Sequence, residues 1–235
     1  MVKKEVSERE EKIEEKESKK KVSLKKNKEL YFIFGVLIGL IVLFLATSAI
    51  FNSLNSFEYE GLTFTKEKFG EIPVYHHYYY IQKITGGVVN VVSDEIIKYN
   101  LFLRYDPRKN DVPIEGSEIE FGSYEDIIYV SVDGFGLEQC EQSSIAVSSL
   151  SSFLTNNLLS VKGATPRQIF AEVNEIPYVT CETHPDNVVI QVQEGDETKV
   201  FSDGNCHIIE AANCEVLQAV EKFEVKAVVD AKRRG

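Results

Sequence analysis

The run LYFIFGVLIGLIVLFLATSAI, Leu30 to Ile50, decides how the rest of this 235-residue chain is organised. It contains no charged residue and no proline. At about 1.5 Å per helical residue it reaches roughly 31 Å, which is enough to cross the hydrocarbon core of a bilayer. A cleaved signal peptide is the alternative, because ATSA at Ala46 to Ala49 offers small residues. Signal cores are usually only about 7–15 residues long, so we predict a single membrane helix over residues 30–51.

Charges on the two sides of this run differ. The ten residues that follow it, FNSLNSFEYE, contain two glutamates and no lysine or arginine. The positive-inside rule then predicts a cytoplasmic N-terminus and an exported C-terminal part, with the bilayer itself as one partner. Six lysines precede the run: Lys19, Lys20, Lys21, Lys25, Lys26 and Lys28.

Residues 1–29 form a charge-dense cytoplasmic tail. Acid–base pairs four residues apart, such as Glu5 with Arg9 and Glu8 with Lys12, favour a solvated helix. A tail that recruits a cytoplasmic partner, as in a signalling relay, is the alternative. The tail holds 11 Lys/Arg and 8 Asp/Glu, so the rest of the chain holds 15 and 29 and carries a net charge of -14. Such an acidic exported part would repel nucleic acid, and we expect no nucleic-acid partner.

We predict that residues 52–235, the exported part, form one α+β domain. From Phe57 to about residue 132, alternating and β-branched segments predict strands separated by turn residues. Further along, helical spacing of apolar residues predicts a helix between Cys140 and Leu158, and another over CEVLQAVEKF. A third, short helix fits TPRQIFAEVN, whereas EVKAVVDAKRRG fits either a strand or a tail. We therefore predict a mixed sheet with two or three helices and a sub-boundary near residue 123.

The run PVYHHYYYIQ, Pro73 to Gln82, places two histidines among four tyrosines. Neighbouring side chains of a strand point to opposite faces. His77 therefore shares a face with Tyr75 and Tyr79, whereas His76 lies on the other face. The two histidines cannot both reach one metal ion, so we interpret the run as aromatic strand packing. A ligand-binding aromatic face is the weaker alternative.

All four cysteines lie after the membrane run, at Cys140, Cys181, Cys206 and Cys214. An even number of cysteines in an exported domain is typical of disulfides. Three pairings are open, and we favour Cys206–Cys214 with Cys140–Cys181, because Cys206 and Cys214 bracket a short strand-to-helix segment.

A metal or thiol site is the competing interpretation of the same cysteines. Cys-x-x-His in CETH resembles a pair of zinc ligands, and a further three residues could complete the site. A thiol nucleophile at Cys140, which begins a predicted helix, is a second option. The zinc ligands would be Cys181, His184, Cys206, His207 and Cys214.

The segment DGFG, Asp133 to Gly136, follows a predicted strand and precedes a predicted helix. Phosphates and catalytic acids often lie at such a place in open α/β sheets. The third glycine of the dinucleotide pattern is absent, and no Gly-Lys-Ser/Thr follows. We interpret the glycines as turn residues, and Asp133 remains the one acid that position alone marks as a candidate.

Three stretches carry a resemblance to a wider group: FEYEGLTFTKEKFGEIPVYHHYYY, YNLFLRYDPRKNDVPIEG, and the region from VTCETHPDNVVIQVQEGDETKVF to NCHIIEAANCEVLQAVEKF. In these the chain resembles uncharacterised single-pass membrane proteins predicted from small-genome archaea. The resemblance covers the membrane run and most of the exported part, and it implies only the topology. It would place the exported side beneath an archaeal surface layer.

These patterns favour a membrane-anchored extracytoplasmic interaction or structural module that is stabilised by two disulfides. We expect a protein partner on the exported side, no cofactor and no catalytic residues. The alternative is a zinc- or thiol-dependent cell-surface enzyme that uses the CETH region.

Overall fold

The computed structural model describes the chain except residues 1–27, 29, 51–54, 84–94, 123–125 and 235. The chain divides into two units, Met1–Asn55 and Ser56–Gly235. In the first, residues Leu30–Ile50 form a helix of mean hydropathy 2.7, which is long and apolar enough to cross a membrane, as predicted. The prediction of a partly helical charged tail concerns residues 1–29 and lies almost wholly outside the described residues.

The second unit has the predicted α+β composition, and its described part contains three helices. The helices are α2 (Ser143–Asn156), α3 (Gln168–Asn174) and α4 (Val216–Arg234). The strands are β1 (Ser56–Tyr59), β2 (Leu62–Phe69), β3 (Ile72–Lys83), β4 (Glu95–Leu103), β5 (Ile114–Gly116), β6 (Ile127–Val132), β7 (Ser160–Ala164), β8 (Val189–Glu194), β9 (Lys199–Asp203) and β10 (Cys206–Ala211).

The strands form two sheets, where a single mixed sheet was expected. The first is an antiparallel meander in the order β1-β2-β3-β4. The second is mixed, in the order β5-β9-β10-β8-β6-β7. In the second sheet β6 pairs in parallel with both β7 and β8, and β8 pairs in parallel with β10. The crossover helix α2 makes the β6-to-β7 connection, as parallel neighbours require.

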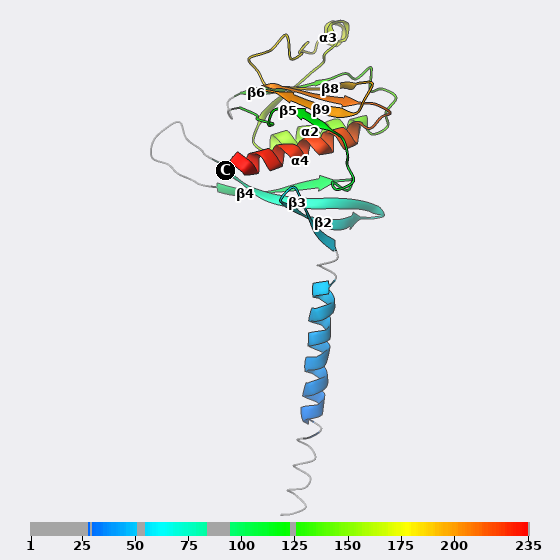
Figure 1. Cartoon of the computed structure of the whole chain (residues 1–235), viewed down its shortest axis with the longest axis vertical. Coiled ribbons are helices and arrows are strands. Elements are labelled where there is room, and N and C mark those ends of the chain that lie inside the picture. Colours follow the sequence, from blue (N-terminus) through cyan, green and yellow to red (C-terminus); the bar gives the residue numbers. More distant parts are fainter. Residues whose placement is uncertain (1–27, 29, 51–54, 84–94, 123–125, 235) are drawn as a thin grey trace, which may run out of the picture. The chain divides into compact units, whose positions relative to one another are not determined.

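The helices α2 and α4 lie between the two sheets, and α3 lies beyond the outer face of the second sheet (Figure 1). Alternation along the strands supports this layering, because every second side chain of a strand faces the helices. Thus Phe64 and Leu101 of the first sheet, Ile190 and Ile209 of the second, and Phe223 of α4 belong to one buried core. The predicted sub-boundary near residue 123 falls at the undescribed residues 123–125.

The C-terminal segment EVKAVVDAKRRG continues helix α4 through Arg234 and is neither a strand nor a tail. Its valines have high strand propensity, which left the prediction open. Val225, Val228 and Val229 recur at helical spacing and are all buried, so tertiary packing selects the helix. The short helix α3 begins at Gln168, two residues later than TPRQIFAEVN suggested, and Arg167 caps it in an extended conformation.

Candidate functional site

The four cysteines form two disulfides, as predicted, but with a different pairing. Cys140 bonds to Cys214 and Cys181 bonds to Cys206. The first bond joins the turn after β6 to the turn before α4, and the second joins the loop after α3 to the first residue of β10. The expected pairs Cys206–Cys214 and Cys140–Cys181 are therefore wrong.

The reason is the position of Cys206 within its strand. Cys206 begins β10 and Cys214 follows its far end, so the six-residue strand separates them. A strand rises about 3.3 Å per residue, and that distance greatly exceeds the Cα separation of a disulfide. The sequence interpretation had placed Cys206 at the end of a strand rather than at its beginning.

The cysteines of the proposed zinc site have no free thiolate, because all are bonded in disulfides. His184 lies beside Thr183 Oγ1 at 2.9 Å, and its ring packs against Tyr129. His207 is fully buried in the core, where Ser202 Oγ lies 2.8 Å from its Nδ1. Burial lowers the pKa of His207, which favours its neutral form. Because these cysteines are bonded in disulfides, they are not available as zinc ligands or as a thiol nucleophile.

The two adjacent histidines of β3 point to opposite faces, as the strand alternation predicted. His77 is buried beside Phe64 and its Nδ1 lies 2.8 Å from the carbonyl oxygen of Thr63. His76 lies on the outer face, between Glu67 Oε1 at 2.8 Å and Asn100 Oδ1 at 3.0 Å. The run is an ordinary strand of the first sheet, with no shared ligand position for the pair.

Asp133, the acid marked by its position, is held by an arginine. Arg167 donates to both carboxylate oxygens, at 2.5 and 2.7 Å, and the backbone N–H of Gly136 donates at 3.0 Å. Burial opposes ionisation of Asp133, but the Arg167 hydrogen bonds outweigh it and lower the pKa. A Cβ on Gly136 would lie 2.7 Å from the carboxylate, so a larger residue there would displace the Asp133 side chain. Asp133 and Arg167 therefore form a structural ion pair that stabilises the turn after β6.

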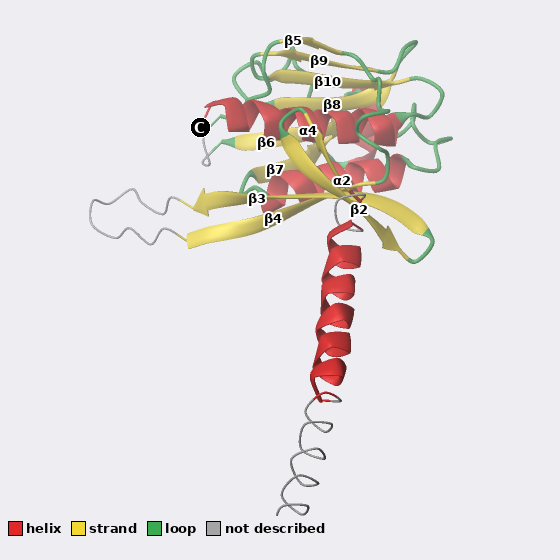
Figure 2. Cartoon of the chain, turned by 60° about the horizontal axis from the view of Figure 1, so that its bottom comes forward, coloured by secondary structure: helices red, strands yellow, loops and turns green. Residues whose placement is uncertain are grey.

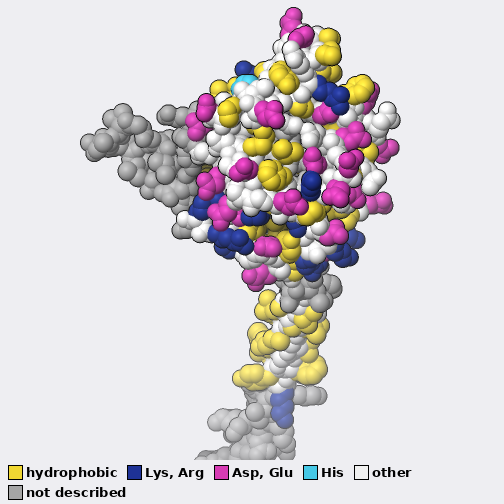
Figure 3. Space-filling view, turned by 45° about the horizontal axis from the view of Figure 1, so that its top comes forward, with side chains coloured by type: hydrophobic (Ala, Val, Ile, Leu, Met, Phe, Trp, Pro, Cys, Tyr) yellow, Lys and Arg dark blue, Asp and Glu magenta, His cyan; other side chains and the backbone are white. Residues whose placement is uncertain are grey.

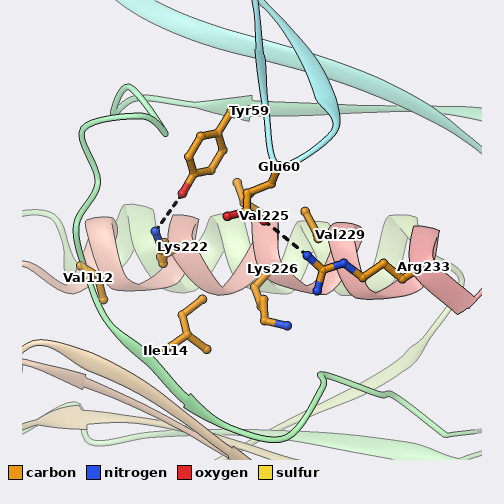
Figure 4. A pocket seen from close by; sticks show the side chains of 9 residues that line it. All are labelled: Tyr59, Glu60, Val112, Ile114, Lys222, Val225, Lys226, Val229 and Arg233. Carbon is orange, nitrogen blue, oxygen red and sulfur yellow. Dashed lines mark hydrogen bonds and ion pairs between the residues drawn. The ribbon is translucent and has the colours of Figure 1, made fainter.

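A small groove of about 240 Å³ runs along α4 beneath the β1–β2 turn (Figure 4). Its walls carry Lys222, Lys226 and Arg233, which would suit an anion. Each cation already has a partner, however. Lys222 donates to Tyr59 Oη, Lys226 donates to Asp230, and Arg233 lies 3.5 Å from Glu60. These contacts occupy all three cations, so the groove is a polar seam between the β1–β2 hairpin and α4.

Three acidic side chains of α4 are almost completely buried. Both oxygens of Glu221 accept backbone N–H bonds, from Arg104 at 2.6 Å and Tyr105 at 3.0 Å. Asp230 accepts from the backbone of Ile119 and from Lys226. These two acids fasten the segment directly after β4, and the chain before β6, to the helix.

Glu224 is the exception among the three acids. Its Oε1 accepts a hydrogen bond of 2.9 Å from Ser149 Oγ, but its Oε2 is buried without a partner among the described residues. Burial, and the nearby charge of Glu221, raise the pKa of Glu224 to about 8. An isolated buried carboxylate is strongly disfavoured, so this side chain is neutral at pH 7.

Glu224 lies against a cleft of about 440 Å³ between the edge strand β4 and helix α2, called here the β4–α2 cleft. Ser149 and Ser152 line it from α2. Asn100 lines it from β4 through its strand edge, because its side-chain oxygen lies 3.0 Å from His76 Nε2 on the outer face. Apolar surface comes from Leu101 and Phe153. The lining residues are Lys98, Tyr99, Asn100, Leu101, Phe102, Ser149, Ser152, Phe153, Asn156 and Glu224.

Sequence reasoning missed Glu224, although the pattern contained a signal. Glu221 and Glu224 each follow an apolar core residue, Leu217 and Val220, by four positions, so they lie on the inward stripe of the helix. An acid on the apolar face of an amphipathic helix must be paired or functional, because burial of a charge is unfavourable.

A second surface feature gathers around α3, where large apolar side chains face solvent. Ile169 and Val173 are 79% and 76% exposed, although helix α3 has only seven residues. The surface, called here the α3 surface, comprises Phe135, Ile169, Phe170, Val173, Ile176 and Tyr178. Figure 3 shows apolar side chains at this end of the domain, interspersed with acidic, basic and neutral polar ones.

No protein-family model, no curated protein and no solved structure matches this chain. The resemblance to small-genome archaeal membrane proteins therefore stays a prediction, and the sequence and the structure alone carry the functional conclusions below.

Proposed function

We propose that this chain is a single-pass membrane protein whose folded domain, residues 56–235, is an extracytoplasmic interaction module. The apolar helix Leu30–Ile50 supports anchoring by its length and its mean hydropathy of 2.7. The lysines before it and the acidic residues after it support an exported domain. Two disulfides agree with that compartment, since reducing cytoplasm rarely preserves them.

The α3 surface is the observation that favours binding to a partner protein. Several large exposed apolar side chains gathered on one segment of a folded domain often mark an interaction site, because water contact with them is unfavourable. Ile169 and Val173, four residues apart, stand on one side of α3, and Phe135 packs beneath Arg167 at 5.1 Å. Glu172 and Glu175 lie exposed on the same segment, so an apolar centre has a polar surround, as interfaces commonly do.

The topology is tested first, with single added cysteines in the full-length protein in intact cells. Gly163→Cys lies at an exposed position with nothing within 4 Å of its Cβ, so it should fold normally. A membrane-impermeant maleimide should label it without cell lysis, and should label Lys21→Cys only after lysis. The reverse labelling pattern would disprove the proposed orientation.

The interaction is tested by a photo-crosslinking amino acid at Val173, with the exposed α2 residue Thr155 as the matched control position. We expect a discrete adduct at position 173 only, and its loss when Ile169→Asp places a charge on the α3 surface. The adduct partner, once identified by mass spectrometry and purified, should bind the full chain in detergent micelles. Equal adducts at both positions, or binding that Ile169→Asp does not weaken, would contradict the proposal.

A further inference from the structure

The free edge of strand β4 is the starting observation. β4 is the last strand of the first sheet, and its only partner among the described strands is β3 (Figure 2). Every second residue of such an edge strand directs both its N–H and its C=O away from the sheet. β4 has nine residues, and its sequence EIIKYNLFL contains two charged residues, Glu95 and Lys98. This is a long edge that few charges protect against pairing with another strand.

The β4–α2 cleft follows that edge. Its lining includes five consecutive residues of β4, from Lys98 to Phe102, and side chains on one side of α2. A cleft between a strand edge and a helix has the shape that an extended peptide needs, because the peptide can pair with the strand while its side chains contact the helix.

The floor of the cleft supplies a chemical preference. Glu224 is fully buried and its Oε2 has no partner in the described part of the chain, whereas both oxygens of Glu221 on the same helix are bonded. A hydrogen-bond donor entering from the cleft beside Ser149 would satisfy that oxygen. Lys98 does not supply this donor, because its ammonium lies 4.1 Å from the ring centroid of Tyr78 on the outer face of the sheet.

We propose that the β4–α2 cleft binds an extended segment of a partner protein, which pairs with β4 as a fifth strand and directs one basic side chain toward Glu224. The inference rests on the proposed interaction function and names a class of partner for it. It concerns a surface that shares no residue with the α3 surface. Charge complementarity supports a basic ligand, since the chain after the tail carries a net charge of -14.

Protonation of Glu224 links this binding to pH. The titratable groups around it are Glu221 on its own helix, Tyr79 of β3 and Tyr99 of β4. Because the pKa of free Glu224 is about 8, a basic side chain must displace its proton at neutral pH. Affinity for a basic peptide should therefore rise as the pH increases from 6 to 8, and affinity for a neutral peptide should not.

The test uses the full-length, disulfide-intact protein in detergent micelles and fluorescein-labelled, end-capped heptapeptides of alternating valine and threonine. One set has lysine or arginine at the centre, and the matched peptide has norleucine there. Fluorescence polarisation should show a Kd below about 1 mM for the basic peptides and at least about tenfold weaker binding of the norleucine peptide. N-methylation of alternate amides on one edge of the peptide should abolish binding, whereas N-methylation on the other edge should not.

Three variants locate the site. Ser152→Phe fills the cleft from an exposed position of α2 and should weaken binding at least about tenfold, whereas Thr155→Phe, on the same helix outside the lining, should not. Glu224→Gln should remove the preference for lysine over norleucine and the pH dependence, while strand pairing remains. Circular dichroism of each variant checks that the fold is retained.

The inference is overturned if no basic peptide binds below about 1 mM, or if Ser152→Phe and Thr155→Phe behave alike. It is also overturned if Ser152→Phe abolishes self-association of the protein, since the edge would then pair with a second copy. If the peptides fail while the adduct at Val173 persists, this inference falls and the proposed interaction function stands. If the adduct fails while the peptides bind, the α3 surface is wrong and the cleft remains.

Discussion

Replacement of Glu224 by glutamine should make the stability of the domain less dependent on pH. The folded state holds the Glu224 proton up to a pKa of about 8, whereas the unfolded chain releases it near the ordinary value of 4.5. Between these two pH values only the folded state binds the proton. The free energy of unfolding contributed by this group is therefore fully present below pH 4.5 and is lost as the pH rises toward 8.

The size of the effect follows from the same two pKa values. Each pH unit within the window lowers the wild-type free energy of unfolding by about 1.4 kcal/mol relative to the glutamine variant. Integrated from pH 5 to pH 8, the variant should gain about 3–4 kcal/mol on the wild type. Packing differences between an amide and a neutral carboxyl are equal at both pH values and cancel from this comparison.

The assay is urea unfolding of the full chain in detergent micelles, with disulfides intact, followed by far-UV circular dichroism at pH 5, 6.5 and 8. Glu172→Gln, which removes an exposed carboxyl of α3, is the matched control and should leave the difference from wild type nearly constant. If the Glu224→Gln difference also stays constant to within about 1 kcal/mol, the buried carboxyl is not protonated as described. The neutral floor of the β4–α2 cleft would then be wrong.

Two further predictions concern the framework of the domain. In the chain-entropy description, Cys140–Cys214 and Cys181–Cys206 span 74 and 25 residues, so replacing each pair by alanines should lower the free energy of unfolding by about 4.5 and 3.5 kcal/mol, measured by urea unfolding. The reverse order would show that unfolded-state entropy does not govern their effect. Gly116→Ala should destabilise by more than about 2 kcal/mol in the same assay, because φ is +94° and the added Cβ would lie 2.0 Å from the Ser202 carbonyl oxygen. Gly163→Ala, with open space around its Cβ, is the control, and equal effects of the two substitutions would refute this account.

The sequence predicted best where a pattern is local and strong. The apolar helix Leu30–Ile50 is defined by composition alone, and the two faces of PVYHHYYYIQ follow from strand alternation without knowledge of any neighbour. The sequence also predicted the α+β class, helix α2 and the start of α4, because the apolar residues of these helices recur at regular spacing. These features need no information about which segments meet in space.

Features that depend on long-range pairing could not be predicted. The separation into two sheets depends on strand neighbours, such as β5 with β9, whose residues lie more than 80 positions apart. The disulfide pairing failed for the same reason, since the direction in which β10 runs past its neighbours decides which cysteines meet. The β4–α2 cleft is a tertiary feature as well. Its only signal in the sequence is an acidic residue, Glu224, on the inward face of a helix.

The disulfide pairing has a consequence for biogenesis. The bond Cys181–Cys206 is nested inside the loop that Cys140–Cys214 closes. In the proposed topology, the domain is exported from its N-terminal side, so Cys140 and Cys181 would reach the oxidising compartment before either native partner does. Their early pairing would be a non-native trap, and it joins the two cysteines that the sequence interpretation paired. In the proposed topology, folding to the native pairing then depends on late oxidation, or on exchange of the early disulfide by attack of a free thiolate.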